Sequence, residues 1–294
     1  MSDQQIPLVS ILCATYNHEK YIKETIEGFL IQKTTFPFEI IIHDDASTDA
    51  TVQIVKSFEF ENPNLFHNIY QEENQFSKDI SSITRIMIQA SKGKYIAFCE
   101  GDDYWTEPLK LQKQVDFLEA NPDFVLCFHQ VNILKTDGSI VEDFITKVPE
   151  NCETIQTLAR FGNYIHTPSV VFRNVLPTLP FELGLSPIGD YFMYMMLAEH
   201  GKLKFIDEKM AIYRHGVGIL SGNDDVLKLK KWIDCLVLIF SNSKNEEIKR
   251  ILYERYQTCV NEMYRMTLRV DNENNFSLIK KKLKNIKNKI YKRK

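Results

Sequence analysis

Three carboxylates crowd into four positions behind an apolar stretch of this chain. Glu100, Asp102 and Asp103 follow the run 94–99, which has the pattern of a short buried strand. Clustered carboxylates repel one another and lose hydration when they are buried, so they need a positive partner. Gly101 lets the backbone bend there and a ligand approach closely. The pattern predicts a divalent cation bound together with a phosphate-bearing substrate; the simpler alternative is a solvated acidic turn.

The elements that must position these acids alternate between strand and helix over the first hundred residues. Strands are predicted over four apolar runs: 8–14, 38–43, 66–70 and 94–99. Helices are predicted over three segments with apolar residues at helical spacing: 19–32, 49–58 and 80–90. This alternation predicts an α/β fold with a mainly parallel sheet flanked by helices, in which ligands bind at the carboxyl ends of the strands. Polar residues follow three of these strands, at 15–18, 44–49 and 100–103.

Beyond residue 108 the pattern is less regular but still mixed. Helices are predicted over 109–120 and 190–200, and strands over 124–132, 169–172, 204–206 and 210–213. The glycines of segment 216–222 are typical of a mobile lid, and the residues after 223 have helical patterns. Because no repeat or low-complexity linker interrupts the chain, we predict one continuous α/β domain with a helical C-terminal extension.

The composition is that of a globular protein, with 44% hydrophobic and 26% charged residues among 294. Six scattered cysteines form no CxxC pair, which favours reduced packing residues over a cysteine metal site. Segment 1–5 is polar and has no signal-peptide core. The apolar run 235–240 is far shorter than the roughly 20 residues that a membrane-spanning helix needs. We therefore predict a cytoplasmic protein without a membrane span.

The net charge of −3 conceals a basic C-terminus. Nine of the 36 basic residues and none of the 39 acidic residues fall in 280–294, which leaves a net charge of −12 on the rest of the chain. Apolar residues recur there at helical spacing: Ile279, Leu283, Ile286 and Ile290. Segment 278–294 therefore predicts a basic amphipathic helix suited to an anionic membrane surface at the inner face of the membrane. A solvated tail is the alternative, and the acidic body argues against a nucleic-acid partner.

Three ordered segments resemble family 2 glycosyltransferases, which are inverting enzymes with the GT-A fold. The segments are 9–17 (VSILCATYN), 42–49 (IHDDASTD) and 93–103 (GKYIAFCEGDD). The resemblance is strong to residue 120 and patchy to residue 222. It implies a Rossmann-like GT-A domain over 1–222, with a nucleotide-binding half near 1–105 and an acceptor half near 106–222. The helical extension with its basic amphipathic tail then covers 223–294.

The resemblance also assigns the donor side of a site. The base and ribose would contact the residues at the end of the first strand: Ala14, Thr15, Tyr16 and Asn17. Tyr16 offers a stacking face, and Asp45 would accept a hydrogen bond from the uracil imide N–H, whereas Asp44 would support the loop. Ser47 and Thr48 have the alternative interpretation of a helix N-cap.

Glu100-Gly101-Asp102 occupies the DxD position of the family, where acids hold Mn²⁺ or Mg²⁺ against the donor diphosphate. With Glu as the first acid, Asp102 is expected to make the closest metal contact, and Glu100 to reach ribose or metal-bound water. His215 matches a segment that in relatives folds over the diphosphate, so it is a further candidate ligand. Arg214 beside it would pair with phosphate.

An inverting transfer needs a base that removes the proton of the acceptor hydroxyl as its oxygen attacks the anomeric carbon. The family carries this carboxylate at the start of a downstream helix, often as Glu-Asp. Asp190 fits with Gly189 in place of Glu; its alternative is a helix cap. Three residues are predicted to contact the acceptor: Asp103, Trp105 and His166. Core packing is an alternative for Trp105, and a structural hydrogen bond for His166.

These inferences predict a metal-dependent inverting glycosyltransferase that moves a sugar from a nucleotide donor, expected to be a UDP-sugar, to an acceptor hydroxyl. The expected partner is a glycan or lipid-linked glycan acceptor, in polysaccharide, lipooligosaccharide or capsule assembly. Two alternatives stay open. One is a catalytically silent GT-A-like scaffold or binding module. The other is a nucleotidyltransferase, which would require a Gly-rich basic phosphate loop that segment 15–19 does not supply.

Overall fold

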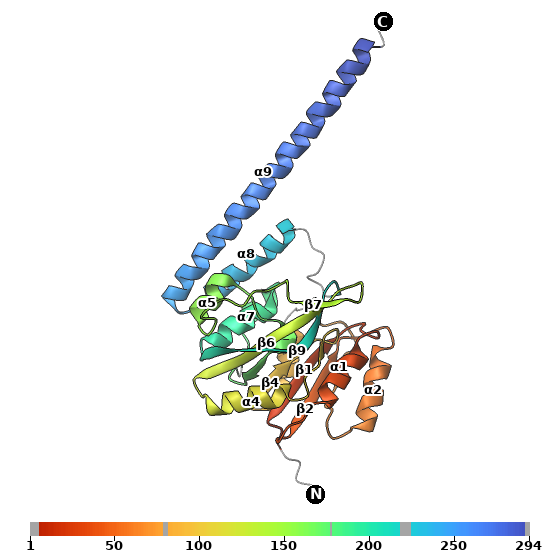
Figure 1. Cartoon of the computed structure of the whole chain (residues 1–294), viewed down its shortest axis with the longest axis vertical. Coiled ribbons are helices and arrows are strands. Elements are labelled where there is room, and N and C mark those ends of the chain that lie inside the picture. Colours follow the sequence, from red (N-terminus) through yellow and green to blue (C-terminus); the bar gives the residue numbers. More distant parts are fainter. Residues whose placement is uncertain (1–5, 79–81, 177, 218–224, 292–294) are drawn as a thin grey trace.

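A mixed β-sheet runs through the middle of the molecule, with helices on both of its faces (Figure 1). The fold is described from a computed structural model, for residues 6–78, 82–176, 178–217 and 225–291, with side chains as far as residue 268.

The sheet brings several strand ends to one edge. The described strands are β1 (Val9–Thr15), β2 (Phe38–Asp44), β3 (Ile69–Tyr70), β4 (Tyr95–Phe98), β5 (Tyr104–Trp105), β6 (Phe124–Leu134), β7 (Ile140–Glu142), β8 (Val171–Arg173) and β9 (Lys202–Arg214). Their order is β3-β2-β1-β4-β8-β6-β9-β5, with β7 beside β6. Strands β1 to β4 are parallel, β8 is antiparallel to β4 and β6, and β9 is parallel to β6. The carboxyl ends of β1, β2, β4, β6 and β9 therefore lie at the same edge.

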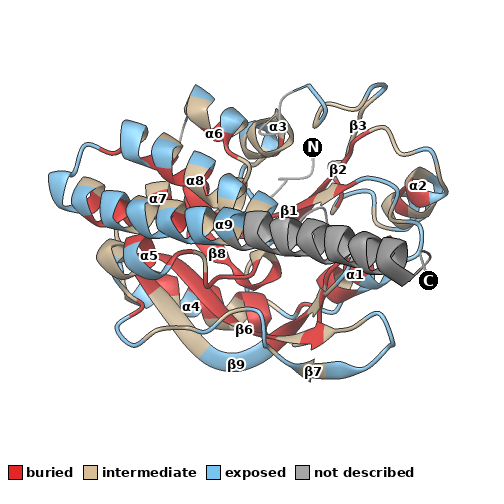
Figure 2. Cartoon of the chain, turned by 90° about the horizontal axis from the view of Figure 1, so that it is seen from above, coloured by how far each residue is buried: buried red, intermediate tan, exposed pale blue. Residues whose placement is uncertain are grey.

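Helices cover both faces of this sheet. They are α1 (Ile22–Leu30), α2 (Thr51–Glu61), α3 (Ser82–Ala90), α4 (Lys110–Ala120), α5 (Ile155–Phe161), α6 (Phe181–Leu185), α7 (Gly189–Ala198), α8 (Asp225–Asn242) and α9 (Glu246–Tyr291), with a 3₁₀ turn η1 (Thr167–Ser169). Helices α1, α2 and α4 pack on one face, and α3 and α5 to α9 on the other. In Figure 2 the buried residues lie along the strands and on the helix sides turned toward them.

Alternating side chains of β1 belong to the two apolar cores, one on each face of the sheet. Ile11 and Cys13 pack toward α1, whereas Leu12 packs toward the opposite helices, and all three are fully buried. Successive side chains of a strand point to opposite faces, so a central strand covered on both sides must be apolar throughout. This explains why the first strand is an uninterrupted apolar run rather than an alternating one.

The described fold contains the predicted α/β alternation, with several differences. The elements β5, β7, α5 and α6 were not predicted, and the predicted strand 169–172 is divided between η1 and β8. Segments 204–206 and 210–213 are not two short strands but parts of the single strand β9. The polar residues between them stay in the strand because each has a partner on a neighbouring element. Asp207 accepts a hydrogen bond from Gln130 on β6. Glu208 pairs with Lys113 on α4, and Lys209 pairs with Glu142 on β7.

The C-terminal helices share the core of the sheet. Cys235 and Leu236 on α8, and Ile251 on α9, are buried in the same apolar cluster as α5 and α7, and α8 and α9 lie side by side (Figure 1). The predicted boundary at residue 222 lies outside the described residues, as does most of the predicted lid 216–222. In the part of the chain that the structure describes, no helix combines the length and apolarity that crossing a bilayer requires.

Candidate active site

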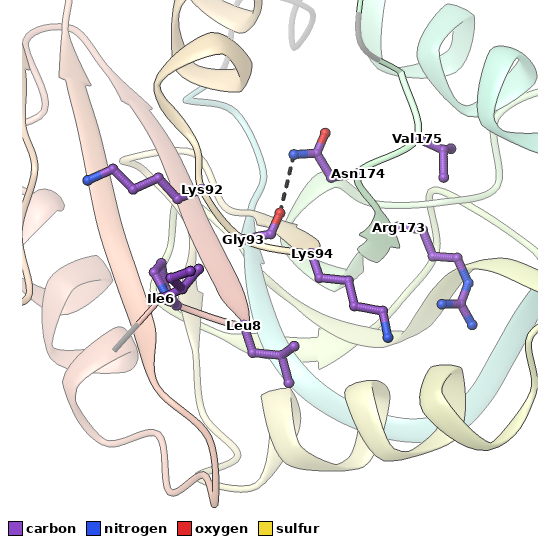
Figure 3. A pocket seen from close by; sticks show the side chains of 9 residues that line it. Ile6, Leu8, Lys92, Gly93, Lys94, Arg173, Asn174 and Val175 are labelled. Carbon is purple, nitrogen blue, oxygen red and sulfur yellow. Dashed lines mark hydrogen bonds between the residues drawn. The ribbon is translucent and has the colours of Figure 1, made fainter. Parts of the chain in front are cut away.

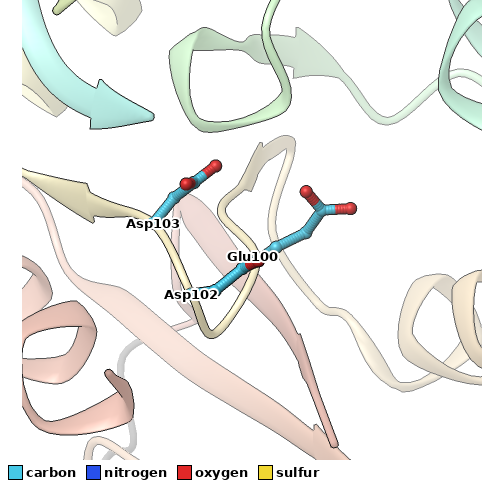
Figure 4. A group of neighbouring side chains, drawn as sticks. All are labelled: Glu100, Asp102 and Asp103. Atoms are coloured by element: carbon cyan, nitrogen blue, oxygen red, sulfur yellow. The ribbon is translucent and has the colours of Figure 1, made fainter. Parts of the chain in front are cut away.

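The three acids follow β4 at the carboxyl edge of the sheet. Glu100, Asp102 and Asp103 each offer a carboxylate oxygen, and these oxygens lie within 4.8 Å of one another. In Figure 4 the carboxylates of Glu100 and Asp103 rise from the same side of the loop. The backbone N–H of Gly101 donates to the carbonyl oxygen of Ala14 at 2.9 Å, which joins this loop to the end of β1.

Gly101 is needed because the acid loop approaches β1 too closely for a side chain. A Cβ atom at this position would lie 2.7 Å from Thr15 Oγ1 and 2.8 Å from His18 Nδ1. The loop is also held from α1, where Thr25 Oγ1 donates to the carbonyl oxygen of Asp103 at 2.7 Å. The positions of the acids are therefore fixed by backbone contacts to two neighbouring elements.

Burial changes the protonation of these acids. Asp103 is 1% exposed, and burial, then the charges of Asp102 and Glu100, hold its pKa well above the usual range. Glu100 is open to solvent at one side but is crowded by protein atoms. This loss of hydration, then the charges of Asp102 and Asp190, raise the pKa of Glu100 to about 8. Glu100 and Asp103 thus resist ionisation in the absence of a positive partner.

A divalent cation fits this cluster. Carboxylate oxygens are the ligands that Mg²⁺ and Mn²⁺ prefer in proteins. Asp103 Oδ2 is buried and accepts no hydrogen bond from the described residues, so it has a lone pair to offer. A cation among Glu100, Asp102 and Asp103 would supply the charge that burial and mutual repulsion call for.

Arg214, the last residue of β9, holds the acid loop from the other side. Its N–H donates to Asp103 Oδ1 at 2.8 Å, and its guanidinium donates to the carbonyl oxygen of Asp102 and to the carboxylate of Glu24. The guanidinium carbon lies 4.7 Å from the ring centre of Tyr104, and the residue is 6% exposed. The structure gives Arg214 a role in holding the loop, while its contact with a donor phosphate stays a prediction.

The loops after β1 and β2 are joined to each other by hydrogen bonds. Asn17 Oδ1 accepts from the N–H of Thr48 at 2.8 Å, and the N–H of Asn17 donates to Ser47 Oγ at 2.9 Å. Helix α2 begins at Thr51 without a side-chain cap, so neither Ser47 nor Thr48 caps it. These two loops, residues 15–18 and 44–49, are called the donor platform below. Tyr16 is 44% exposed on it, which leaves its ring accessible to a nucleotide base.

Asp44 and Asp45 are both buried but have different partners. Both carboxylate oxygens of Asp45 accept backbone N–H groups, from Gln75 at 2.7 Å and from Phe76 at 3.0 Å. Asp44 Oδ1 accepts the N–H of Ser47 at 2.9 Å, whereas its Oδ2 is buried without a partner among the described residues. The oxygen that lacks a hydrogen bond thus belongs to Asp44, and the predicted contact of Asp45 with uracil is untested.

Asp190 lies in the first turn of α7. Its charge contributes to the raised pKa of Glu100, so the two carboxylates share one region of space. Burial raises the pKa of Asp190 itself, against the opposing effect of hydrogen bonds from its own helix and from Asn163. The Nδ2 of Asn163 donates to Asp190 Oδ2 at 2.7 Å. Asp190 therefore lies within electrostatic reach of Glu100, and its role as the base stays a prediction.

The remaining predicted residues have mixed outcomes. His166 is buried, and its Nε2 lies 2.9 Å from Asp143 Oδ2. The ring of His215 packs against Phe144 at 5.4 Å, and His215 is not in the carboxylate group found among the described residues. Its ligation of a metal stays a prediction.

Trp105 requires a correction, because it packs in the core rather than lining an acceptor site. It is 1% exposed, and its Nε1 donates to the carbonyl oxygen of Pro168 at 2.8 Å. The ring lies 4.8 Å from that of Phe29 on α1. Asp103, the other residue of this segment predicted to contact the acceptor, is buried in the acid cluster.

Three polar side chains at the site were not predicted: His18, Thr25 and Asn163. His18 Nδ1 is buried without a hydrogen-bond partner among the described residues, and burial lowers the pKa of this imidazole. Thr25 lies on the apolar side of α1, between Ile22 and Ile26. For Thr25, a hydroxyl within an apolar helix face was the signal available in the sequence, since a buried donor requires an acceptor.

A cavity of about 480 Å³ lies at the opposite end of the strands, beside the start of β1 and β4 (Figure 3). Two of its cations already have partners: Lys94 pairs with Glu119, and Arg173 donates to the carbonyl oxygen of Phe124. None of the acids or donor-side residues lines this cavity. The chemistry-bearing residues therefore gather at the carboxyl edge and not there.

Relatives of known sequence match parts of the chain of different length. The uncharacterized protein Rv1520 of Mycobacterium tuberculosis is 38% identical over 212 residues, which are 72% of this chain and 60% of that protein. The chain thus spans less than two thirds of that relative. The UDP-Glc:alpha-D-GlcNAc-diphosphoundecaprenol beta-1,3-glucosyltransferase WfaP of Escherichia coli is 36% identical over 117 residues, which are 40% of this chain and 43% of WfaP.

The fold has solved counterparts. The structure of S. aureus TarS 1–349 in complex with UDP superposes with a TM-score of 0.59 at 20% identity, covering 84% of this chain and 70% of that one. The sheet flanked by helices is therefore the GT-A fold, as predicted. Residues 10–176 match the family described as glycosyl transferase family 2, a stretch that includes β1, β2 and the acid loop. The chain belongs to glycosyltransferase family 2.

Proposed function

We propose that this chain is a metal-assisted, inverting glycosyltransferase that moves a sugar from a nucleotide donor to an acceptor hydroxyl. The observation that carries the proposal is the gathering of Glu100, Asp102 and Asp103 into one cluster, with Asp190 near enough for its charge to raise the pKa of Glu100. Family membership supports the reaction class. Asp190 lies beyond the matched residues, so its assignment as the base depends on its position in the structure and on the resemblance.

A UDP-sugar is the proposed donor. The relative WfaP is named for UDP-Glc, and the TarS structure with a similar fold contains UDP. In this chain the base and ribose would contact the loops at the ends of β1 and β2, where Tyr16 is exposed and Asp44 Oδ2 has no hydrogen-bond partner among the described residues. Residues 1–105 would form this donor half, and residues 106–222 the acceptor half.

Each acid has a proposed role. Glu100 and Asp102 would hold Mn²⁺ or Mg²⁺, with Asp103 beside them; when bound, the cation would neutralise charge on the diphosphate. Asp190 would accept the proton of the acceptor hydroxyl as its oxygen attacks the anomeric carbon. Attack from the side opposite the departing nucleotide inverts the configuration of that carbon. His166, held by Asp143, would contact the acceptor.

A glycan or lipid-linked glycan is the proposed acceptor, as in polysaccharide, lipooligosaccharide or capsule assembly. WfaP is named for a diphosphoundecaprenol-linked sugar, which supports an acceptor at a membrane. Segment 278–294 would bind the protein to the anionic inner face of the membrane, as a peripheral cytoplasmic protein. Its side chains lie outside those described, so this role rests on the sequence.

Calorimetric titration of UDP and GDP, with and without Mn²⁺, tests the donor site. We expect UDP to bind only with the metal, and Asp190→Asn to keep this binding while losing sugar transfer from a panel of UDP-sugars. A variant that retains transfer would remove Asp190 as the base. If neither nucleotide binds, the result would favour the catalytically silent scaffold. Nucleotidyl transfer to a sugar phosphate would favour the nucleotidyltransferase.

A further inference from the structure

The proposed base has a polar neighbour from another part of the chain. Asn163 lies in the connection between α5 and η1, and its Nδ2 donates to Asp190 Oδ2 at 2.7 Å. The residues are 27 positions apart, so the contact exists only in the folded protein. Because the acceptor is a carboxylate, this hydrogen bond belongs to the stronger, charge-assisted kind.

The orientation of the Asn163 amide is fixed by a second contact. The backbone N–H of Ile165 donates to Asn163 Oδ1 at 3.2 Å. An N–H can only be met by an oxygen, so the NH₂ end of the amide must point toward Asp190. The side chain therefore presents a donor to the carboxylate, and an aspartate of the same shape could not do so while ionised.

Other groups around Asp190 do not replace this contact. Gly189 precedes it, and among the described residues outside its own helix turn no atom lies within 4 Å of the place where a Cβ would be, so that position offers no side chain for support. The titratable groups that interact with the carboxylate come from five elements: Glu100 after β4, His166 before η1, Tyr194 on α7, Tyr213 on β9 and Cys235 on α8. Among the described side chains, only Asn163 has a hydrogen bond to Asp190 in this structure.

We propose that Asn163 is the positioning residue for the base. By holding Oδ2, it fixes the rotation of the Asp190 carboxylate, so that the other oxygen is directed to the acceptor hydroxyl. Asn163 thereby supplies support that Gly189 cannot give from the adjacent position. The inference rests on the proposed function, because it requires Asp190 to act as the base.

Steady-state kinetics test the role. We expect Asn163→Ala to lower kcat by up to about 100-fold, the cost that a misplacement of about 1 Å can carry. UDP affinity in Mn²⁺ and the KM for the UDP-sugar should not change, because the donor platform is untouched. Asn163→Ser, which keeps a short donor, should recover part of kcat. The matched control is Asn174→Ala, which removes comparable hydrogen bonds at the opposite end of the sheet and should behave as the wild type. An unchanged kcat in Asn163→Ala would overturn the proposal.

A second experiment tests the contact without using activity. Asn163→Asp is isosteric but places two carboxylates side by side, so thermal unfolding at pH 7.5 should occur at a lower temperature than in the wild type. The exchange variant Asn163→Asp with Asp190→Asn restores a donor opposite an acceptor, and should recover most of the loss. Equal unfolding temperatures for Asn163→Asp and the exchange variant would refute the contact. If the contact holds but the wild type transfers no sugar from any UDP-sugar tried, the proposed function fails, and the role of Asn163 with it.

Discussion

Among single residues, Asp102 gives the most direct test of the proposed cation. Asp102→Asn removes a charge without changing the shape of the side chain, and the loop is held by backbone contacts that do not involve this carboxylate. We expect Mn²⁺ affinity to fall more than about 100-fold, because changes outside the ligand shell alone cost 10- to 100-fold. Calorimetric titration of Mn²⁺ into the variant and the wild type measures this affinity. Asp116→Asn on the exposed side of α4 is the matched control, and an unchanged affinity in Asp102→Asn would contradict the metal assignment.

The raised pKa of Glu100 predicts how stability depends on pH. The folded protein keeps a proton on Glu100 up to about pH 8, whereas the unfolded chain releases it near pH 4.5. The folded state thus binds more protons between these values, so the free energy of unfolding contributed by Glu100 is fully present below pH 4.5 and is lost as the pH rises to about 8. Urea unfolding at pH 5 and pH 8, without metal, measures the loss.

Glu100→Gln isolates this effect, because its side chain stays neutral across the range. The variant should lose less stability between pH 5 and pH 8 than the wild type, and added Mn²⁺ should restore stability at pH 8 in the wild type only. Parallel pH curves for the two proteins would show that Glu100 is not held protonated in the fold.

At the scale of elements, β9 connects the far half of the sheet to the acid loop through its last residue. Arg214→Met removes the guanidinium hydrogen bonds to the Asp102 carbonyl and to Glu24 but preserves much of the apolar volume. We expect a loss of about 2 kcal/mol in the free energy of unfolding, the usual range for hydrogen bonds that involve a charged group. Glu24 is half-exposed, so its ion pair adds little to this.

The same variant tests whether the loop needs β9 to form the cation site. Weaker Mn²⁺ binding in Arg214→Met, measured by calorimetry, is expected because the loop would lose a contact that fixes the Asp102 backbone. Arg160→Met, at an exposed position on α5, is the matched control. A variant that unfolds as the wild type does would show that the strand end is not required.

The sequence predicted the elements that build the donor side better than the contacts between them. Apolar runs such as β1 are local signals, and the acids after β4 were found because three lie within four positions. Thr25 and Asn163 were missed because their partners are 78 and 27 positions away, and no local pattern encodes such distances. Trp105 was misassigned for a related reason: next to the acids in sequence, it points into the core beneath them.

At the scale of the whole molecule, the packed part of the C-terminal helices and the proposed membrane-binding segment 278–294 lie at different places along α9. Buried contacts of α9 reach Cys259, where the helix still packs on the core. Segment 278–294 begins well after that point, so removing it leaves the described core contacts in place. A single truncation can therefore test the proposed membrane binding without removing the described core contacts.

Deletion of 278–294 should release the protein from anionic vesicles while leaving its unfolding temperature and its UDP binding unchanged. Each surface Lys or Arg contributes about 1 kcal/mol near an anionic bilayer, so exchanging Lys280, Lys281 and Lys282 for Gln should weaken partitioning by about 100-fold. Sedimentation with phosphatidylglycerol vesicles measures this, and phosphatidylcholine vesicles, which lack net charge, serve as the control. High salt should reduce binding of the intact chain in the same way, because the attraction between exposed charges is screened. Equal sedimentation of the intact and truncated proteins would show that the tail is simply solvated, and the acceptor would then have to reach the site without help from the bilayer.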